Sequence, residues 1–385
     1  MAARRPLPGR FFVHFGSLPD RRVKRTRRYP LIHLLFMAFC AVLCGRHGWD
    51  DIEVFAQERR TFFRRFFRLR KTSPSADTFR RVFERLEPKL FAEAFMSWAN
   101  ELLAVVAKHL AIDGKSLAGV VDGAHKTSPL HLLHVWATEQ RLLLGMVKVN
   151  GAPGETMGTK EMLERLVLAG SVLTLDANGC TQEIARKIIE RQGDYVLALK
   201  GNRGPIHAAV VDHWQQRQAS GFAGTRVHRA RCQGHGRVER RTVHVSGVDF
   251  LPEEMRAKWA DLRSVARVER TRIVGNHTSV EVHFYLMSLE PEPRQASELI
   301  RRHWSVENEL HWSLDVGMKE DASLVKTPAS AHNLGVLRRM ALNVLKHPKA
   351  GKESLRHKQD RALMSDRALL RLLSHGPHPE PKEAA

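Results

Sequence analysis

The sequence predicts an α/β protein whose mixed sheet follows an all-α region and is interrupted by a β-rich insertion. Residues 11–100 carry apolar side chains at the spacing of helices. Residues 105–203 alternate strand-like and helix-like runs in the order β-β-β-α-β-α-β, which is typical of an antiparallel start followed by parallel βαβ units. Residues 204–290 alternate apolar and polar residues, with no convincing helix between the strand-like runs, which favours antiparallel strands.

The last part of the chain returns to helix and then loses its apolar pattern. Residues 291–348 have helical spacing, whereas residues 349–385 form a polar tail whose last dozen residues we expect to be disordered. The predicted division of the chain is therefore 11–100, 105–203, 204–290, 291–348 and 349–385.

The chain is strongly basic, with 62 Lys and Arg residues against 41 Asp and Glu residues and a formal net charge of +21. An excess of this size indicates a polyanionic partner, either nucleic acid or an anionic membrane surface. The longest apolar run, residues 31–44, contains His33 and is shorter than the roughly 20 residues that span a bilayer, so no membrane partner is expected. Four cysteines in 385 residues fit a reducing cytoplasm.

Two segments of the N-terminal region concentrate this charge. Residues 21–28 contain six basic residues in eight, and residues 59–71 predict a helix with an aromatic side and a basic side. The two sides consist of Phe62, Phe63, Phe66 and Phe67, and of Arg64, Arg65 and Arg68. The pattern fits a helix with a solvated basic face and fits phosphate binding equally well.

Two predicted strands end in the same way. The runs HLAIDG and VLTLDANG place Asp113 and Asp176 after an apolar strand and directly before turn residues. If the strands are parallel neighbours, both carboxylates emerge at one edge of the sheet, where open α/β sheets bind ligands. The alternative is that each aspartate is simply the first residue of a turn.

A third carboxylate would turn such a pair into a metal site. Close carboxylates repel unless a cation lies between them, and Mg²⁺ prefers oxygen ligands. Three carboxylates could hold two ions, which would act on the attacking oxygen and the leaving oxygen when a phosphodiester is cut. The segment 301–321, RRHWSVENELHWSLDVGMKED, offers Glu307, flanked by His303 and His311 on a predicted helix. The apolar stripe of that helix would be Leu299, Val306, Leu310 and Leu314.

Three blocks of the chain resemble the DDE transposases of bacterial insertion sequences. They are AIDGKSLAG, LTLDANGCTQEIARKIIERQGDYVLALKGN and RRHWSVENELHWSLDVGMKEDAS. The nearest branch is the ISAs-type, which includes the H-repeat-associated proteins. SLPDRRVKRTRRYPLIHLLFMAFCAVLCG and SADTFRRVF resemble its N-terminal associated domain, so the resemblance covers roughly residues 11–348.

The resemblance implies a ribonuclease H-like fold and a catalytic set. The core would combine 105–203 with 291–348, the insertion would be 204–290, and the DNA-binding helices would be 11–100. Asp113, Asp176 and Glu307 would hold two Mg²⁺ ions, for which Mn²⁺ can substitute. The broader superfamily places a Tyr, an Arg and a Lys around this Glu. Ile300, His303 and Leu314 occupy those places here, so no role of the Tyr or the Lys is transferred.

The activity implied is cleavage of DNA at the inverted-repeat ends of an element by metal-activated water, followed by joining of the 3′ ends to target DNA. The expected partners are double-stranded transposon ends and target DNA, bound by a homodimer in the cytoplasm of a bacterium, at the nucleoid. Two other functions stay open: a catalytically decayed or domesticated DNA-binding protein, and a metal-dependent nuclease without strand transfer. The intact Asp–Asp–Glu set argues against the first.

Further DNA contacts are expected near the catalytic set. Lys200 and Asn202 follow a strand that should end at the catalytic edge, where a DNA backbone contact and a plain turn are equally open. His303 is a further candidate, beside Glu307. Trp259 follows an acidic, turn-like stretch, so it is a candidate for exposure and for stacking on an unstacked base. The alternative, which we favour, is that Trp259 caps a small core of the insertion.

The other residues of 301–321 are expected to have structural roles. Solvated surface or ion pairing with Arg and Lys is expected for Glu309, Asp315, Glu320 and Asp321. Trp304 and Trp312 are expected to be packing anchors, with base stacking as the alternative.

Overall fold

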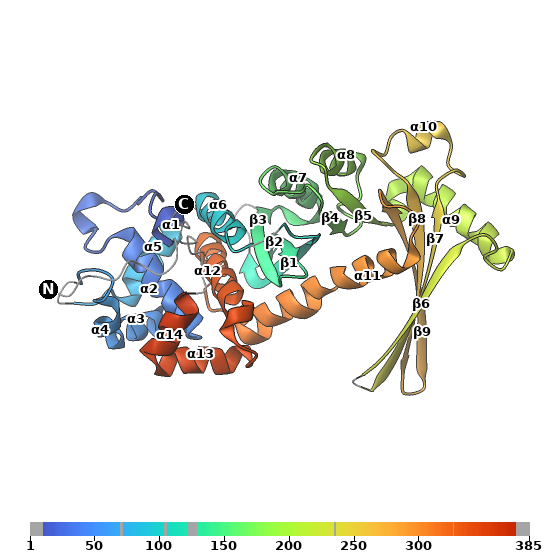
Figure 1. Cartoon of the computed structure of the whole chain (residues 1–385). Coiled ribbons are helices and arrows are strands. Elements are labelled where there is room, and N and C mark those ends of the chain that lie inside the picture. The colour runs from blue at the N-terminus through green and yellow to red at the C-terminus, as the bar shows by residue number, and fades with distance from the viewer. Residues whose placement is uncertain are drawn as a thin grey trace, which may run out of the picture.

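The computed structural model describes residues 11–69, 72–103, 106–121, 129–234, 236–325 and 327–374. The molecule is elongated: helices form one end, a sheet with helices on both faces forms the middle, and long β-hairpins form the other end (Figure 1). None of the helices in these ranges is both long and apolar enough to span a membrane.

The N-terminal region is helical, as predicted. Its helices are α1 (Phe11–Phe15), α2 (Leu31–Leu43), α3 (Trp49–Glu58), α4 (Arg60–Phe63), α5 (Ala76–Arg85) and α6 (Pro88–Asn100), with a 3₁₀ turn at Lys24–Thr26. The helix expected over 59–71 is shorter than predicted and ends at Phe63, but its two sides are as expected. All four phenylalanines are buried, whereas Arg64, Arg65 and Arg68 are exposed.

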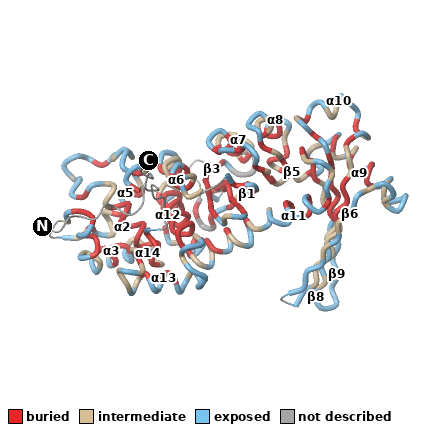
Figure 2. Tube along the Cα trace, viewed as in Figure 1, coloured by how far each residue is buried: buried red, intermediate tan, exposed pale blue. Residues whose placement is uncertain are grey.

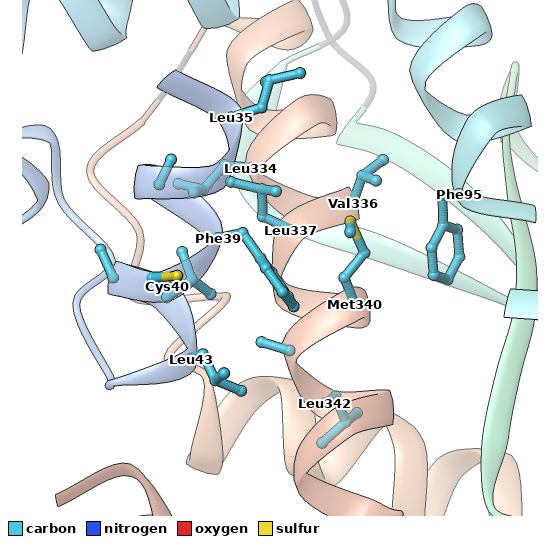
Figure 3. Close-up of a cluster of buried hydrophobic side chains, with 14 of the residues drawn as sticks. Leu35, Phe39, Cys40, Leu43, Phe95, Leu334, Val336, Leu337, Met340 and Leu342 are labelled. Carbon is cyan, nitrogen blue, oxygen red and sulfur yellow. The ribbon is translucent and has the colours of Figure 1, made fainter. Parts of the chain in front are cut away.

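The N-terminal helices share one apolar core with the C-terminal part of the chain. Helix α12 (Pro328–Lys346) is buried along most of its length and packs against α2, and Figure 3 shows Phe39 of α2 beside Leu337 and Met340 of α12. Phe95 of α6 lies in the same cluster. Helices that are far apart in the sequence are therefore held together by a common hydrophobic core.

The sheet contains nine strands in the order β3-β2-β1-β4-β5-β9-β8-β7-β6. The first five are β1 (His109–Val121), β2 (Pro129–Ala137), β3 (Leu142–Val149), β4 (Val172–Leu175) and β5 (Asp194–Leu199). Strands β1, β4 and β5 are parallel, while β2 and β3 run antiparallel to their neighbours. The order and directions of these five strands confirm the predicted ribonuclease H-like mixed sheet.

Helices cover both faces of this part of the sheet. Helices α7 (Gly151–Leu163) and α8 (Gln182–Glu190) pack on one face, together with alternate strand residues such as Leu110 and Ile112. Helix α11 (Pro293–His303) crosses the opposite face (Figure 1). Because successive strand residues point to opposite faces, Asp113 lies on the α11 face.

The β-rich segment differs from the prediction at its N-terminal end and between two of its strands. It begins with a helix that was not predicted, α9 (Gly204–Ala219), which buries Ile206, Val210 and Trp214 at helical spacing. Its strands are β6 (Arg226–Gly234), β7 (Arg237–Gly247), β8 (Ser264–Val274) and β9 (His277–Met287), with the short helix α10 (Glu253–Arg256) between β7 and β8. Strand β9 pairs with β5, so these strands continue the core sheet. Figure 2 shows them exposed where they project from the body.

The C-terminal region also corrects two predictions. The helix that begins with α11 widens into π-helical turns at Val306–His311 and Ser313–Gly317, where a regular α-helix was expected. The prediction of a polar tail over 349–385 is partly wrong. This part of the chain contains α13 (Leu355–Met364) and α14 (Asp366–Leu373), which follow a 3₁₀ turn at Pro348–Ala350. Leu369 and Leu373 of α14 join the core that contains α2. Of the last dozen residues, for which disorder was expected, Ser374 is the C-cap of α14 and residues 375–385 lie outside the described residues.

Candidate active site

Asp113 and Asp176 lie on neighbouring strands at the point where β4 ends. The last parallel pair joins Ile112 to Leu175, so the two aspartates are the next residues in the same register. Asp176 follows the end of its strand, as predicted. Strand β1, however, continues along β2 as far as Val121, so the expectation that both aspartates end strands is wrong for Asp113.

Gly114, the second residue of the Asp-Gly pair, lies within strand β1 at a position that has no room for a Cβ atom. A Cβ atom at this position would lie 2.4 Å from Nε2 of His131 and 2.7 Å from Oε1 of Glu155. Glycine is therefore needed for the close approach of two neighbouring side chains, which is one of its uses within strands.

The carboxylate of Asp176 is held by the turn that follows it. Its Oδ1 accepts hydrogen bonds from the backbone N–H groups of Asn178 (3.1 Å) and Gly179 (3.2 Å). Burial and the charge of Glu155 nevertheless raise the pKa of Asp176 above its usual value. The turn fixes the direction of the carboxylate, and its surroundings oppose the negative charge.

Glu307 approaches the aspartates from the helix on the same face of the sheet. Val306, Leu310 and Leu314 are fully buried beneath this helix, as the predicted apolar stripe requires. Glu307 itself is exposed at the edge of the stripe. It occupies the π-helical stretch, a rare conformation that is frequent at functional sites.

All three acids line one pocket of about 210 Å³. Burial, followed by the charges of Asp176 and Glu307, raises the pKa of Asp113 from 3.8 to about 7. Tyr285 of β9 and Lys200, after β5, belong to the polar part of the wall. The pocket therefore concentrates negative charge in a place where water can compensate for little of it.

The donor set suits a hard divalent cation, because the three acids offer only carboxylate oxygens. A cation there would relieve the repulsion that raises the pKa of Asp113. Within the described residues, however, no group of three or more His, Cys, Asp or Glu side chains is placed so that it could hold a metal ion as it stands. The chemistry of the donor set fits an ion, and the three carboxylates would have to come closer together to share one.

Two histidines flank this pocket, as their positions around Glu307 predict. His303 Nδ1 lies 2.9 Å from Oγ1 of Thr174, and burial lowers the pKa of His303 to about 4. His311 Nδ1 lies 3.9 Å from Oδ2 of Asp113, and burial lowers the pKa of His311 to about 3. Both rings are therefore neutral at pH 7 and contribute polarity without charge.

Glu155 is a fourth acid of the region that the sequence did not reveal. It lies on α7, on the other side of the sheet, and its carboxylate contacts Nε2 of His131 (2.7 Å) and Nδ2 of Asn178 (2.9 Å). Its charge raises the pKa of both Asp113 and Asp176. No spacing in the sequence links Glu155 to the aspartates, and the close approach at Gly114 becomes visible only in three dimensions.

The remaining acids of 301–321 are paired with basic residues, and this prediction is confirmed. Lys115 Nζ lies 2.8 Å from Asp315 and 3.4 Å from Asp321, and Arg141 lies 3.0 Å from Glu309. Arg339 binds both carboxylate oxygens of Glu320, at 2.6 and 3.1 Å, and both side chains are fully buried. Among the acids of this segment, Glu307 is the one that lines the pocket of the aspartates.

A basic groove of about 570 Å³ adjoins the carboxylate pocket. We call it the arginine groove, after the six arginines that line it: Arg231, Arg237, Arg241, Arg270, Arg272 and Arg301. Five of them come from β6, β7 and β8, and Arg301 comes from α11. Trp304 and Glu307 line the groove and the pocket at once, so the two spaces meet along this helix.

The tryptophans are arranged differently from the predictions. Trp259 is 4% exposed, so its candidate exposure is wrong and it is a packing residue. It lies in the large core that the sheet shares with α8 and α9, and not in a small core of the insertion as the favoured alternative had it. Trp304 and Trp312 are 36% and 58% exposed, so the expectation that they are packing anchors is wrong. Their helix buries Val306 and Leu310 instead, which turns both indole rings outward.

The other candidate DNA contacts lie in two places. Lys200 and Asn202 are exposed beside the Asp176 turn, where Asn202 donates a hydrogen bond to the carbonyl of Ala177 (3.4 Å). The exposed arginines of the N-terminal region do not line the pocket, and Arg65 is paired with Asp366 of α14 (3.0 Å). Three basic residues of 21–28 bind nearby carboxylates, namely Arg21, Arg22 and Arg27. The other basic residues of this segment are left for other partners.

The family models and the relatives that match this chain agree on one family. Residues 12–99 match the model of a DDE_Tnp_1-associated domain, and residues 106–344 match that of a transposase DDE domain. The chain is 30% identical to the putative transposase YncI of Escherichia coli O157:H7 over 91% of each chain. It is 29% identical to the H repeat-associated putative transposase YhhI of Escherichia coli K12 over 94% of this chain and 97% of YhhI. A solved structure, the piggyBac transposase synaptic complex with hairpin DNA, is 10% identical, with a TM-score of 0.42 over 93% of this chain and 76% of that one.

Proposed function

We propose that this chain, which belongs to the family of transposases with a DDE domain, cuts DNA at the ends of an insertion sequence and joins the freed 3′ ends to target DNA. The observation that carries the proposal is the pocket shared by Asp113, Asp176 and Glu307, which meets the arginine groove. Both steps are displacements at phosphorus, so one site can serve water first and a 3′-hydroxyl second.

The ions in this proposal are two Mg²⁺ per site, held by Asp113, Asp176 and Glu307, with Mn²⁺ as a substitute. When bound, such ions activate the nucleophile and stabilise charge on the leaving oxygen. The register of β1 and β4 fixes the two aspartates relative to each other, and the N–H groups of the following turn orient Asp176. Glu307 is exposed on its helix, so it is the ligand that can move to close the set.

The surroundings of the pocket suit a phosphodiester substrate. The arginines of the groove can neutralise phosphates on one side, and Lys200 can do so beside Asp176. Double-stranded transposon ends and target DNA are therefore the proposed partners. A homodimer is proposed in the DNA complex, since two ends must be held together, and the cytoplasm of a bacterium is the proposed place of action.

Recognition of the element's ends is proposed for the N-terminal helices. Arg64 and Arg68 are exposed on a framework of buried phenylalanines and have no carboxylate partner among the described residues, whereas Arg65 is tied to Asp366. Each phosphate neutralised should contribute about −0.9 to the slope of log affinity against log salt. Replacing Arg64 and Arg68 by Ala should flatten this slope for a terminal repeat; an unchanged slope would make the arginines a solvated surface.

The catalytic proposal is tested by cleavage of a duplex that carries a terminal repeat. Asp113→Asn, Asp176→Asn and Glu307→Gln should each abolish Mg²⁺-dependent cleavage while leaving binding of the repeat largely intact. Glu298→Gln is the matched control, since Glu298 is exposed on α11 and lines neither the pocket nor the groove.

The same assay separates the alternatives. A variant such as Asp176→Asn that cuts as well as the wild type would overturn the catalytic set. Cleavage by the wild type without any joining of 3′ ends would reduce the activity to that of a nuclease. Binding of the repeat without cleavage, with Mg²⁺ and with Mn²⁺, would leave a DNA-binding protein.

A further inference from the structure

The turn that follows β4 is held through three polar groups of Asn178. Its backbone N–H donates to Oδ1 of Asp176 (3.1 Å), and its side-chain Nδ2 donates to Oε2 of Glu155 (2.9 Å). Its carbonyl oxygen accepts hydrogen bonds from Oγ1 of Thr156 (3.3 Å) and from Nη2 of Arg203 (3.1 Å). The turn is therefore bound by α7 and by the segment before α9, as well as by Asp176 itself.

These contacts affect Asp176 because the same turn orients its carboxylate. Asp176 lies one residue beyond Leu175, the last paired residue of β4, so strand pairing does not fix its side chain. Its Oδ1 accepts from the N–H groups of Asn178 and Gly179 instead. The direction of this carboxylate therefore depends on how firmly the turn is held.

Glu155 has surroundings that a role in the framework does not explain. It is buried, and its charge acts against the charges of Asp113 and Asp176. In the part of the chain that the structure describes, no lysine or arginine forms an ion pair with it, and its Oε1 contacts Nε2 of His131 (2.7 Å). A buried acid beside other acids costs stability. The position of Glu155 therefore favours a role in the site over a role in holding the fold.

His131 fixes the direction of the Glu155 carboxylate. Its Nδ1 lies 2.9 Å from Oγ of Ser116 and its Nε2 lies 2.7 Å from Oε1 of Glu155, so the ring is held at both nitrogens. Since Oε1 is bound to His131 and Oε2 to Asn178, the carboxylate cannot rotate without losing a hydrogen bond. Gly114 leaves the space that His131 and Glu155 occupy. A chain of hydrogen bonds thus runs from β1 to the turn.

We propose that Glu155 is a positioning residue for the candidate active site: through Asn178 it fixes the turn that orients the carboxylate of Asp176. This inference rests on the proposed function, because it concerns a metal ligand of the same site. Glu155 lines neither the pocket nor the arginine groove, so it acts through Asn178 and not as a ligand. Partners that orient a ligand in this way typically contribute about 10- to 100-fold to metal affinity or activity.

Three variants separate the hydrogen bond of Glu155 from its charge. Glu155→Ala removes the contact with Asn178, and Asn178→Ala removes it from the other side. Glu155→Gln removes the charge but keeps an oxygen that accepts from Asn178, and its amide can donate to His131 in the other tautomer of the ring. Glu161→Ala is the matched control, because Glu161 is on α7 as well but pairs with Lys89 (3.0 Å).

Hydrogen–deuterium exchange of the protein alone, without divalent ions, measures how firmly the turn is held. The amides of residues 178 and 179 should exchange at least about 5-fold faster in Glu155→Ala and in Asn178→Ala, and as in the wild type in Glu155→Gln and Glu161→Ala. Exchange in α12 should not change. An unchanged turn in Glu155→Ala, or equal acceleration in Glu155→Gln, would overturn the proposal. Faster exchange in α12 as well would make Glu155 part of the framework and would contradict it too.

Titration with Mn²⁺ at pH 8 connects the turn to the metal site. Glu155→Ala should weaken binding of Mn²⁺ at least about 10-fold, and Glu155→Gln less than about 3-fold. The double variant Glu155→Ala/Asn178→Ala should bind no more weakly than either single variant, because both changes remove the same contact. Losses that add up in the double variant would mean that the two residues act separately, against the proposal.

The outcomes separate this inference from the proposed function. If Glu155→Ala loosens the turn and weakens Mn²⁺ binding but the wild type cuts no DNA, the positioning role stands and the transposase activity does not. If Asp176→Asn abolishes cleavage while Glu155→Ala neither loosens the turn nor weakens Mn²⁺ binding, the activity stands and Glu155 is not a positioning residue.

Discussion

Glu307 and Glu320 belong to the same segment of the sequence, 301–321, and have opposite surroundings. Glu307 joins Asp113 and Asp176 in one pocket, where burial and then the repulsion between the acids raise the pKa of Asp113 to about 7. A few turns further along the chain, Glu320 is completely buried and bound by Arg339. Burial alone would raise the pKa of Glu320, but Arg339 outweighs burial and the pKa is lowered.

This difference separates the acids that are available to bind a ligand from the acids that stabilise the fold through ion pairs. A buried acid that is matched by a base is part of the framework. A buried acid that faces only other acids costs stability until a cation arrives. The paired acids therefore anchor the helix behind the pocket, and the unpaired acids in front of it are left for the ion and the DNA.

The largest effect on stability is expected for the paired group. Arg339→Met should lower the free energy of unfolding by about 3–5 kcal/mol, because it leaves the carboxylate of Glu320 buried and unpaired. Urea unfolding at pH 7 measures the change. The double variant Arg339→Met/Glu320→Leu should recover most of the loss, and a loss below about 1 kcal/mol in the single variant would show that the pair is not part of the framework.

The unpaired group should respond in the opposite direction. Because the pKa of Asp113 rises from 3.8 to about 7 on folding, the folded chain keeps a proton in this range that the unfolded chain releases, so stability falls as the pH rises from 3.8 to about 7. Without divalent ions, Asp113→Asn should therefore stabilise the protein at pH 8 by up to about 4 kcal/mol, from 1.36 kcal/mol per pKa unit.

Thermal melts between pH 4 and pH 8 measure this effect. The gain from Asp113→Asn should be small near pH 4, where the folded wild type is protonated, and should level off above pH 7. A gain that is constant with pH, or a loss at pH 8, would mean that burial and the neighbouring acids do not raise the pKa of Asp113.

The smallest effect is expected for the exposed pair in the same segment. Arg141 and Glu309 are 3.0 Å apart, with side chains that are 63% and 34% exposed. Arg141→Gln should change the free energy of unfolding by less than about 1 kcal/mol, since solvent screens such pairs. A larger loss in urea unfolding would place this pair with Glu320 and Arg339 in the framework.

Local patterns in the sequence predicted the features that depend on neighbouring residues. The apolar stripe through Val306, Leu310 and Leu314 and the register of Asp113 beside Asp176 follow from periodicity and from the ends of apolar runs. The pairing of the remaining acids with bases followed from charge alone. These features depend on short stretches whose own residues determine the outcome.

The features that the sequence did not reveal depend on contacts across the fold. Strand β1 continues past Asp113 because it pairs with β2, and Gly114 leaves room there for His131 and Glu155, which come from other elements. Trp259 is buried and Trp304 is exposed because of the elements that pack around each side chain in the folded protein. Acidic or apolar neighbours in the sequence do not determine this exposure. Helix α9 is a different case, because Ile206, Val210 and Trp214 have a helical spacing that the reading of 204–290 as strands overlooked.

The most direct test of the central claim is divalent ion binding by the protein alone. Isothermal titration of the wild type with Mn²⁺ at pH 8 should show saturable binding that Asp113→Asn, Asp176→Asn and Glu307→Gln each weaken at least about 10-fold, since each removes a ligand of one shared site. Glu298→Gln should bind as the wild type does. If Glu307→Gln binds Mn²⁺ as tightly as the wild type while the two aspartate variants do not, the helix does not supply the third ligand and the account of the site is wrong.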